Sequence, residues 1–390
     1  MLRTTLALAL TLAATLTASS AGLAQTARTE TTPPPAKPRP EWAAISKQCA
    51  TTARAKPSAK ALKIAETAKD EFYYFGGHRI DGNGRLFSFG VIESEQEESD
   101  ENITTYRLGH LGWWHVLRYW RLLADAKQPV DAAKRFLRLR GFADASAQPD
   151  DQDIAKPARL GLDKALQAID SINGSVKLSP LEKEIMKEAL IRAAINDVAW
   201  SAAFISAVMR QSGMSETEFD FSEAHGTYIY KAFEIALAET AGTKTEGFYR
   251  ACPLTSARPR LGDLVCYHRH NRLHGAKRAA EIRGMILDDL ADTAKSDSIY
   301  KSHCDVVAHV DMKAGRVYVV GGNVQQAVTV KKLALRRRDG TLAEIQPDGC
   351  KVDGRWTFPK ADPAKPVAPH YSDECSLNRK HWFVLLQARS

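Results

Sequence analysis

The sequence contains no long apolar run after its first residues. No later segment reaches the ~18 apolar residues that a membrane-spanning helix needs. The start of the chain instead has one early basic residue, Arg3, an apolar stretch over residues 6–16, and the small residues Gly22 and Ala24. This pattern is typical of a secretory signal peptide, which is removed, and not of a membrane anchor. No cysteine stands at the expected cleavage site, so we do not expect a lipoprotein. Because no later apolar run is long enough to span a bilayer, we do not expect stable membrane insertion either.

An excess of acidic residues is also missing. The 54 Lys and Arg residues outnumber the 46 Asp and Glu residues and give a formal net charge of +8. A modest positive charge would hold an exported protein near acidic cell-wall polymers or anionic lipid surfaces. The basic clusters at 268–278 and 331–338 lack the interleaved aromatic residues of single-strand binders, so no nucleic-acid partner is expected.

Composition changes along the chain predict its organisation. The segment TTPPPAKPRP at residues 31–40 is typical of a stiff polyproline linker. We expect four parts in order: a signal peptide over 1–24, a Pro-rich linker over 25–41, a mostly helical N-terminal subdomain with a hairpin over 42–178, and a core over 179–390. The core is expected to carry an insertion at 268–302 and a C-terminal extension.

The N-terminal subdomain shows helical spacing over 60–75 and 105–124, and DGNG within 79–93 predicts a hairpin. Glu93 and Glu95 would share one face of a strand, as a glycosidase carboxylate pair could. The acidic run that they begin is more typical of a solvated loop.

Two helices open the core. Ser179 and Pro180 predict the start of the first helix, and Ser201 starts a second that is apolar almost all round and ends at Gly213. A serine in the first turn of a buried helix meets the positive end of the helix dipole and unpaired amides. The alternative is that Ser201 is simply an N-cap or a small packing residue.

Short strands follow these helices. A turn and a strand are expected over 260–267, a strand opening with His303 over 302–310, another over 315–320 that runs into Asn323, and a further extended run from residue 328. Their close spacing predicts an antiparallel meander. Helices followed by such a meander indicate an α+β fold.

Four motifs carry a resemblance to known families: WSAAFI, RPRLGDLV, HCDVV and GGNV, spread over residues 196–335. Their order resembles the papain-like cysteine, histidine-dependent amidohydrolases and peptidases of bacteria, with serine in place of the nucleophilic cysteine. The serine version, together with FSEAHGTYIYKAF, resembles a bacterial family known as domain of unknown function 2272, which has no assigned activity. The first resemblance implies a papain-like core in which Ser201 attacks, His303 moves the proton and Asn323 orients the imidazole.

A serine makes stricter demands than a cysteine, because it must lose its proton to a base in concert with attack. Trp200, His225 and Asp263 are the expected substrate-binding residues. His225 could line the same cleft, or it could be a core histidine bonded to a carbonyl.

Other histidines are grouped in HRHNRLH, as His268, His270 and His274. They could form a metal site, but no acidic partner stands at helical spacing and surface loops often carry histidines. No metal or other cofactor is expected.

Six cysteines in an exported chain predict disulfides. Because side chains alternate along a strand, Cys304 should point away from the face of His303, where Cys266 on the preceding strand could approach it. Cys350 and Cys375 could join in the C-terminal segment, whereas Cys49 and Cys252 have no assigned partner.

These features together favour a periplasmic or secreted hydrolase. The expected substrate is an amide or ester bond of a cell-envelope polymer, with peptidoglycan peptide as the first choice. The alternative is a non-catalytic cell-wall binding or scaffolding module on a degenerate papain-like fold. The sequence gives no prediction of oligomeric state.

Export is directly testable. We expect cleavage after Ala24, because small residues at Gly22 and Ala24 follow the short apolar stretch. N-terminal sequencing of the exported protein checks this, and a retained Met1 in membrane-extracted protein would contradict it.

Overall fold

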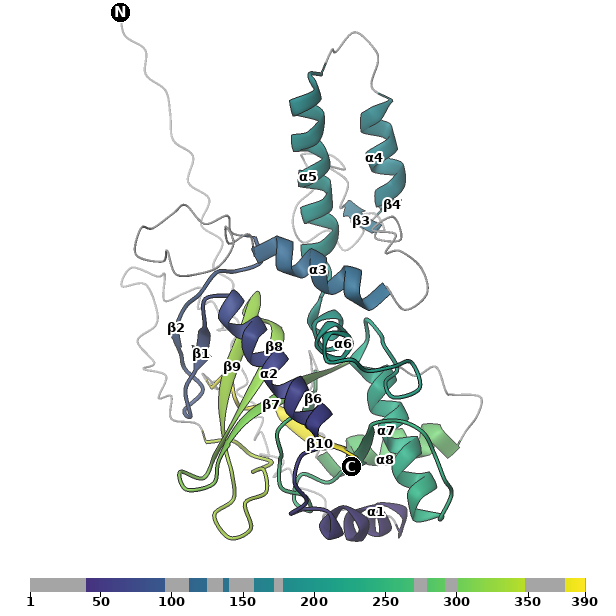
Figure 1. Cartoon of the computed structure of the whole chain (residues 1–390), viewed down its shortest axis with the longest axis vertical. Helices are drawn as coiled ribbons and strands as arrows, with labels where there is room; N and C mark the ends of the chain where they lie inside the picture. The colour runs from purple at the N-terminus through teal and green to yellow at the C-terminus, as the bar shows by residue number, and fades with distance from the viewer. Residues whose placement is uncertain are drawn as a thin grey trace, which may run out of the picture. The chain divides into compact units, whose positions relative to one another are not determined.

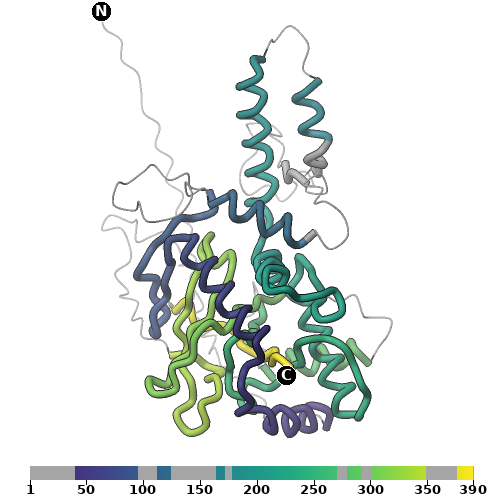
Figure 2. Tube along the Cα trace, in the orientation of Figure 1, coloured from purple at the N-terminus to yellow at the C-terminus, as the bar shows by residue number. Residues whose placement is uncertain are grey.

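The computed structural model describes residues 40–94, 112–124, 136–139, 158–171, 178–269, 279–291, 301–347 and 376–389, most of which Figure 2 traces in colour. The expected signal peptide and most of the linker lie outside these ranges, as do Glu95, His270, His274, Cys350 and Cys375. The described residues between Pro38 and Ser390 pack as one unit. Helices and a mixed sheet confirm the α+β class (Figure 1).

The central sheet has eight strands among the described residues, wider than the expected meander. Their order is β2 (Leu86–Ser88), β1 (His78–Ile80), β9 (Ala327–Ala334), β8 (Arg316–Val324), β7 (Ser302–Asp311), β6 (Leu264–His268), β10 (His381–Ala388) and β5 (Tyr249–Cys252). All neighbours are antiparallel except β1 and β9, which are parallel. The meander from β6 to β9 is therefore confirmed, and strands from both flanking segments extend it.

Helices precede and interrupt this sheet. They are α1 (Pro40–Thr51), α2 (Ala59–Tyr74), α3 (Gly112–Ala124), α4 (Leu162–Asp170), α5 (Pro180–Asn196), α6 (Ser201–Gln211), α7 (His225–Thr240) and α8 (Ala279–Ala291). A separate ladder joins β3 (Phe136–Leu139) to β4 (Ala158–Gly161). Figure 1 shows α4 and α5 side by side, and the two helices are in contact. No helix in the described ranges is long and apolar enough to cross a membrane.

The N-terminal segment shares the core sheet. The DGNG turn joins β1 to β2 as an antiparallel hairpin, as expected. β1 then pairs with β9, and α2 packs against β7, β8 and β9. Residues of the expected N-terminal subdomain thus add strands to the sheet that carries the candidate site.

Both core helices begin where the sequence predicts, and the second ends just before Gly213. Ser179 and Glu182 form a capping box at the start of α5, with Pro180 in its first turn. Gly213 follows α6 with a φ of 80°, a backbone conformation that glycine adopts without strain. All side chains of α6 from Ser201 to Met209 are buried, and the helix packs on β7, β8 and α3.

Two disulfides join described residues. Cys266 and Cys304 form the expected bond between β6 and β7. Cys49 and Cys252, which the sequence left unassigned, link α1 to β5. Both bonds are consistent with an exported protein.

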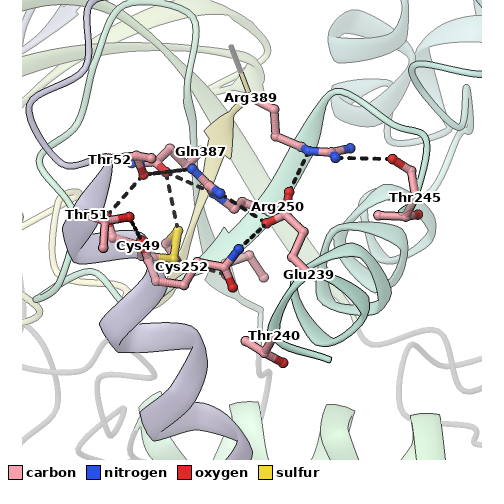
Figure 3. A network of polar contacts seen from close by, with 12 residues as sticks. Cys49, Thr51, Thr52, Glu239, Thr240, Thr245, Arg250, Cys252, Gln387 and Arg389 are labelled. Carbon is pink, nitrogen blue, oxygen red and sulfur yellow. Dashed lines mark hydrogen bonds and ion pairs between the residues drawn. A yellow bond between two sulfur atoms is a disulfide. The ribbon is translucent and has the colours of Figure 1, made fainter. Parts of the chain in front are cut away.

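A polar network surrounds the second disulfide (Figure 3). The carboxylate of Glu239 at the end of α7 forms ion pairs with Arg250 at 3.0 Å and Arg389 at 2.7 Å. Arg250 also donates to the buried Gln387 side chain, which accepts a further bond from Thr52 at 2.7 Å. One carboxylate therefore ties α7 to β5 and to the end of β10.

Removal of this carboxylate should destabilise the fold. We expect Glu239→Ala to lower the free energy of unfolding by about 3 kcal/mol, because two largely buried guanidinium groups lose their anion. Urea unfolding measures the change. Glu234→Ala on the same helix is the control, because its ion pair with Lys231 is exposed and should contribute less than about 0.5 kcal/mol. Equal effects of the two variants would contradict the assigned role.

Candidate active site

Ser201 occupies the first turn of α6 and is 2% exposed. Its Oγ lies 2.7 Å from Nε2 of His225 and 3.4 Å from Nη2 of Arg269. No side chain caps the start of α6, since its N-cap residue Trp200 makes no such bond. The hydroxyl therefore lies beside backbone amides that have no acceptor within the helix.

The backbone of β7 fixes the proton on His225. Cys266 and Cys304 lie opposite each other with a Cα separation of 4.1 Å, typical of a non-hydrogen-bonded antiparallel pair. The N–H of Cys304 consequently faces away from β6 and donates to Nδ1 of His225 at 3.2 Å, where the hydroxyl of Tyr228 also makes contact. Because Nδ1 accepts, Nε2 of neutral His225 carries the proton and donates it to Ser201.

Burial lowers the pKa of His225 well below its usual value, and the nearby His303, Arg269 and Lys331 lower it further. His225 is therefore neutral and acts as a donor to Ser201. It is not oriented to accept the Ser201 proton.

His303 offers the opposite arrangement. Its Nε2 lies 3.0 Å from Oδ1 of Asp305, so this nitrogen carries the proton and donates. Its Nδ1 accepts a hydrogen bond of 2.7 Å from Arg269. Burial lowers the pKa of His303 to about 4 against the pull of Asp305, so the imidazole is neutral at pH 7 with a lone pair on Nδ1.

Asp305 is held as an anion by a buried lysine. Lys331 Nζ lies 2.8 and 2.7 Å from the two carboxylate oxygens and near the rings of Tyr267 and Trp382. Burial alone would raise the pKa of Asp305, but Lys331 and the bond from His303 outweigh it and lower the pKa to about 2. The carboxylate can therefore orient His303 at every physiological pH.

The two glycines of the GGN motif leave room for this arrangement. A Cβ on Gly321 would lie 1.8 Å from Oδ1 of Asp305 and 3.0 Å from Nε2 of His303. A Cβ on Gly322 would lie 2.4 Å from Cβ of Phe204 on α6. Any side chain at Gly321 would therefore displace His303 and Asp305, and any side chain at Gly322 would displace α6.

Asn323 differs from its expected role. It has a φ of 52° beside an irregularity in the β8–β9 pairing, and within the described ranges no hydrogen bond joins it to His303. Asp305 orients the imidazole instead. The signal was present in the sequence, because residues two apart on a strand share a face and Asp305 follows His303 by two.

Two of the expected substrate-binding residues have structural contacts. Trp200 is fully buried, stacks on Phe75 at 5.8 Å and donates its indole N–H to Glu93, whose pKa burial raises. The indole therefore supports α6 from within the core and has no exposed surface for a cleft wall.

Asp263 is also fully buried, and its carboxylate accepts from the backbone N–H groups of Arg260 and Ala388 at 2.8 Å each. The Asp263 carboxylate thus joins the turn before β6 to the end of β10. Its side chain has no exposed surface that a substrate could contact.

Arg269 is the residue that the sequence did not indicate. Arg269 is the first residue after β6. Its Nη2 is within hydrogen-bond distance of both Ser201 Oγ and His303 Nδ1. Arg269 forms no salt bridge with any acidic side chain in the described part of the chain. Nor do the described residues contain a group of three His, Cys, Asp or Glu side chains arranged to hold a metal.

The Asp305–Lys331 pair predicts a pH-dependent stability. We expect Lys331→Met to lower the free energy of unfolding at pH 7 by about 3–5 kcal/mol, because it leaves a buried carboxylate without its cation. The folded pKa of Asp305, about 2, lies below the ~3.9 of an unfolded aspartate. Its stabilisation is thus present above pH ~4 and is lost as the pH falls through about 2.

The difference between wild type and Lys331→Met should therefore narrow in acid, as measured by urea unfolding at pH 7, 4 and 2.5. The neighbouring Lys332→Met is the control, because Lys332 is only half-buried. A difference that stays constant with pH would contradict the role of the pair.

Comparison with protein families places most of the described core in one of them. The family model described as "Uncharacterized protein conserved in bacteria (DUF2272)" matches residues 178–388, more than half of the 390-residue chain. This range runs from the cap of α5 to the end of β10. It contains every residue of the Ser201 cluster, which consists of Ser201, His225, Arg269, His303, Asp305 and Lys331. No curated protein and no solved structure matches the chain. The chain belongs to the DUF2272 family of bacterial proteins.

Proposed function

We propose that the protein is an exported hydrolase of an amide or ester bond, with Ser201 as nucleophile. The observation that carries the proposal is the shared hydrogen bonding of Arg269 Nη2 to Ser201 Oγ and His303 Nδ1. The lone pair of the histidine and the serine hydroxyl thus converge on one atom. No hydrogen bond joins Ser201 Oγ directly to His303 Nδ1 among the described residues, because the guanidinium lies against both atoms. In the proposed reaction the guanidinium turns aside, and the serine hydroxyl then donates its proton to His303 Nδ1.

The reaction then follows the logic of a serine, histidine and aspartate triad. Ser201 Oγ attacks the carbonyl carbon while its proton passes to His303 Nδ1, and Asp305 stabilises the resulting imidazolium. His303 gives that proton to the leaving nitrogen or oxygen as its bond to carbon breaks. Water then attacks the acyl-serine with the same base, which releases the acid and restores the Ser201 hydroxyl.

The donors around Ser201 suit the charge that develops. The amides at the start of α6 can stabilise the oxyanion of the tetrahedral intermediate. His225 Nε2–H holds the Ser201 oxygen and supports its negative charge during attack. The resemblance to papain-like amidases implies the same nucleophile and base, whereas Asp305 takes the orienting role that it implied for Asn323.

We propose a cell-envelope polymer in the periplasm or outside the cell as the substrate, with peptidoglycan peptide as the first choice. The two disulfides suit an oxidising compartment, and the net positive charge suits an acidic polymer.

A binding module is the second candidate. Ser201 is 2% exposed, and both groups that contact its oxygen are donors, as expected of a structural serine. In that case, the protein would bind wall peptides without turnover.

A serine-directed probe separates the two functions. We expect a fluorophosphonate to label Ser201 in the wild-type protein and peptidoglycan incubation to release products detectable by mass analysis. Ser201→Ala should abolish labelling and lower turnover by roughly 10³-fold or more. The free energy of unfolding should fall by only about 1–3 kcal/mol, because the variant leaves the buried His225 N–H without its acceptor. Ser206→Ala on the same buried helix is the matched control, because among the described residues that hydroxyl exchanges hydrogen bonds with the backbone of Ser222 and with no group of the candidate site.

The control should keep labelling and turnover. Absence of labelling in the wild type, together with unchanged co-sedimentation of Ser201→Ala with peptidoglycan, would favour the binding module.

A further inference from the structure

We propose that Arg269 binds a substrate carboxylate, so that the substrate is a peptide cleaved at its last amide bond, beside a free C-terminal carboxylate. This inference rests on the proposed function and adds its substrate class. Its basis is the position of one guanidinium group against both the nucleophile and the base.

The charges of the cluster leave one cation without an anion. Burial keeps His225 and His303 neutral, and Lys331 is neutralised by Asp305. Arg269 is the remaining charge, and no acidic side chain of the described segments pairs with it. The acceptors of this partly buried guanidinium are uncharged: the His303 imidazole and the hydroxyls of Ser201 and Tyr267. A carboxylate would compensate its charge better, with two parallel charge-assisted bonds.

Distances limit where that carboxylate can be attached. Arg269 Nη2 is 3.4 Å from Ser201 Oγ and 2.7 Å from His303 Nδ1, so an anion on this guanidinium lies next to the reacting atoms. The carboxyl group of a C-terminal residue is two bonds from the nitrogen of the scissile amide. A carboxylate further along a peptide would lie too far from the bond that Ser201 attacks.

Binding of the carboxylate also releases the base. As the guanidinium turns to the substrate anion, its bond to His303 breaks and Nδ1 becomes free to accept the Ser201 proton. A substrate with a neutral end would leave Arg269 on His303. The same residue therefore contributes to specificity in both binding and activation.

The carboxylate preference of Arg269 can be measured as binding in a variant that cannot turn over substrate. In the Ser201→Ala protein, calorimetry compares acetyl-dialanine as the free acid with its C-terminal amide, each in the L,L and D,D forms. We expect the acid of at least one form to bind about 10- to 100-fold more tightly, as a lost charge-assisted hydrogen bond predicts. Added Arg269→Gln should reduce this ratio to about one, and Arg269→Lys should leave an intermediate value.

Arg337→Gln in the same background is the control, because Arg337 is exposed and outside the cluster. It should leave the acid-to-amide ratio unchanged. Equal affinity for acid and amide, no binding of either acid, or a preference that survives Arg269→Gln would each overturn the inference.

Fluorophosphonate labelling of the wild type tests the proposed function separately. Labelling without an acid preference would refute only the role of Arg269. An Arg269-dependent preference without labelling would refute the hydrolase, and with it the cleavage step, and would leave Arg269 as the carboxylate-binding residue of a binding module.

Discussion

The buried carboxylate of Asp305 is the group on which the candidate site depends. It is removed from solvent, yet it stays ionised because Lys331 lies against both of its oxygens. Oδ1 of Asp305 also accepts a hydrogen bond from Nε2 of His303. This bond orients the imidazole so that its other nitrogen, Nδ1, faces Arg269 and the start of α6. The chain accommodates this ion pair at the centre of its sheet, where β7 and β9 flank β8.

Much of this framework could be predicted because it depends on local rules. The capping box at Ser179, the apolar helix from Ser201 and the glycine stop at Gly213 are set by neighbouring residues. Alternation along β7 correctly paired Cys304 with Cys266. The width of the sheet could not be predicted in this way, because β1 and β10 join it from distant parts of the chain.

The finer features of the site depend on contacts between distant segments. His225 on α7 meets a backbone N–H of β7, and Arg269 reaches both α6 and β7 from the end of β6. No periodicity in the sequence encodes such contacts. Asp305 is different, because the alternation that placed Cys304 also places this carboxylate beside His303. Family motifs directed attention to Asn323, although the carboxylate that orients the imidazole lies on the same strand as His303.

The GGN motif has a consequence for how such proteins are recognised. Gly321 and Gly322 are needed because they have no side chain. A methyl group at Gly321 would overlap the Asp305 carboxylate, and one at Gly322 would overlap the Phe204 side chain. The motif is thus a signature of two layers packed too closely for a side chain at either glycine. Its asparagine adopts the left-handed backbone conformation, with a φ of 52°. Searches for distant relatives would discriminate better if they weighted the paired glycines together with a histidine and an aspartate two residues apart.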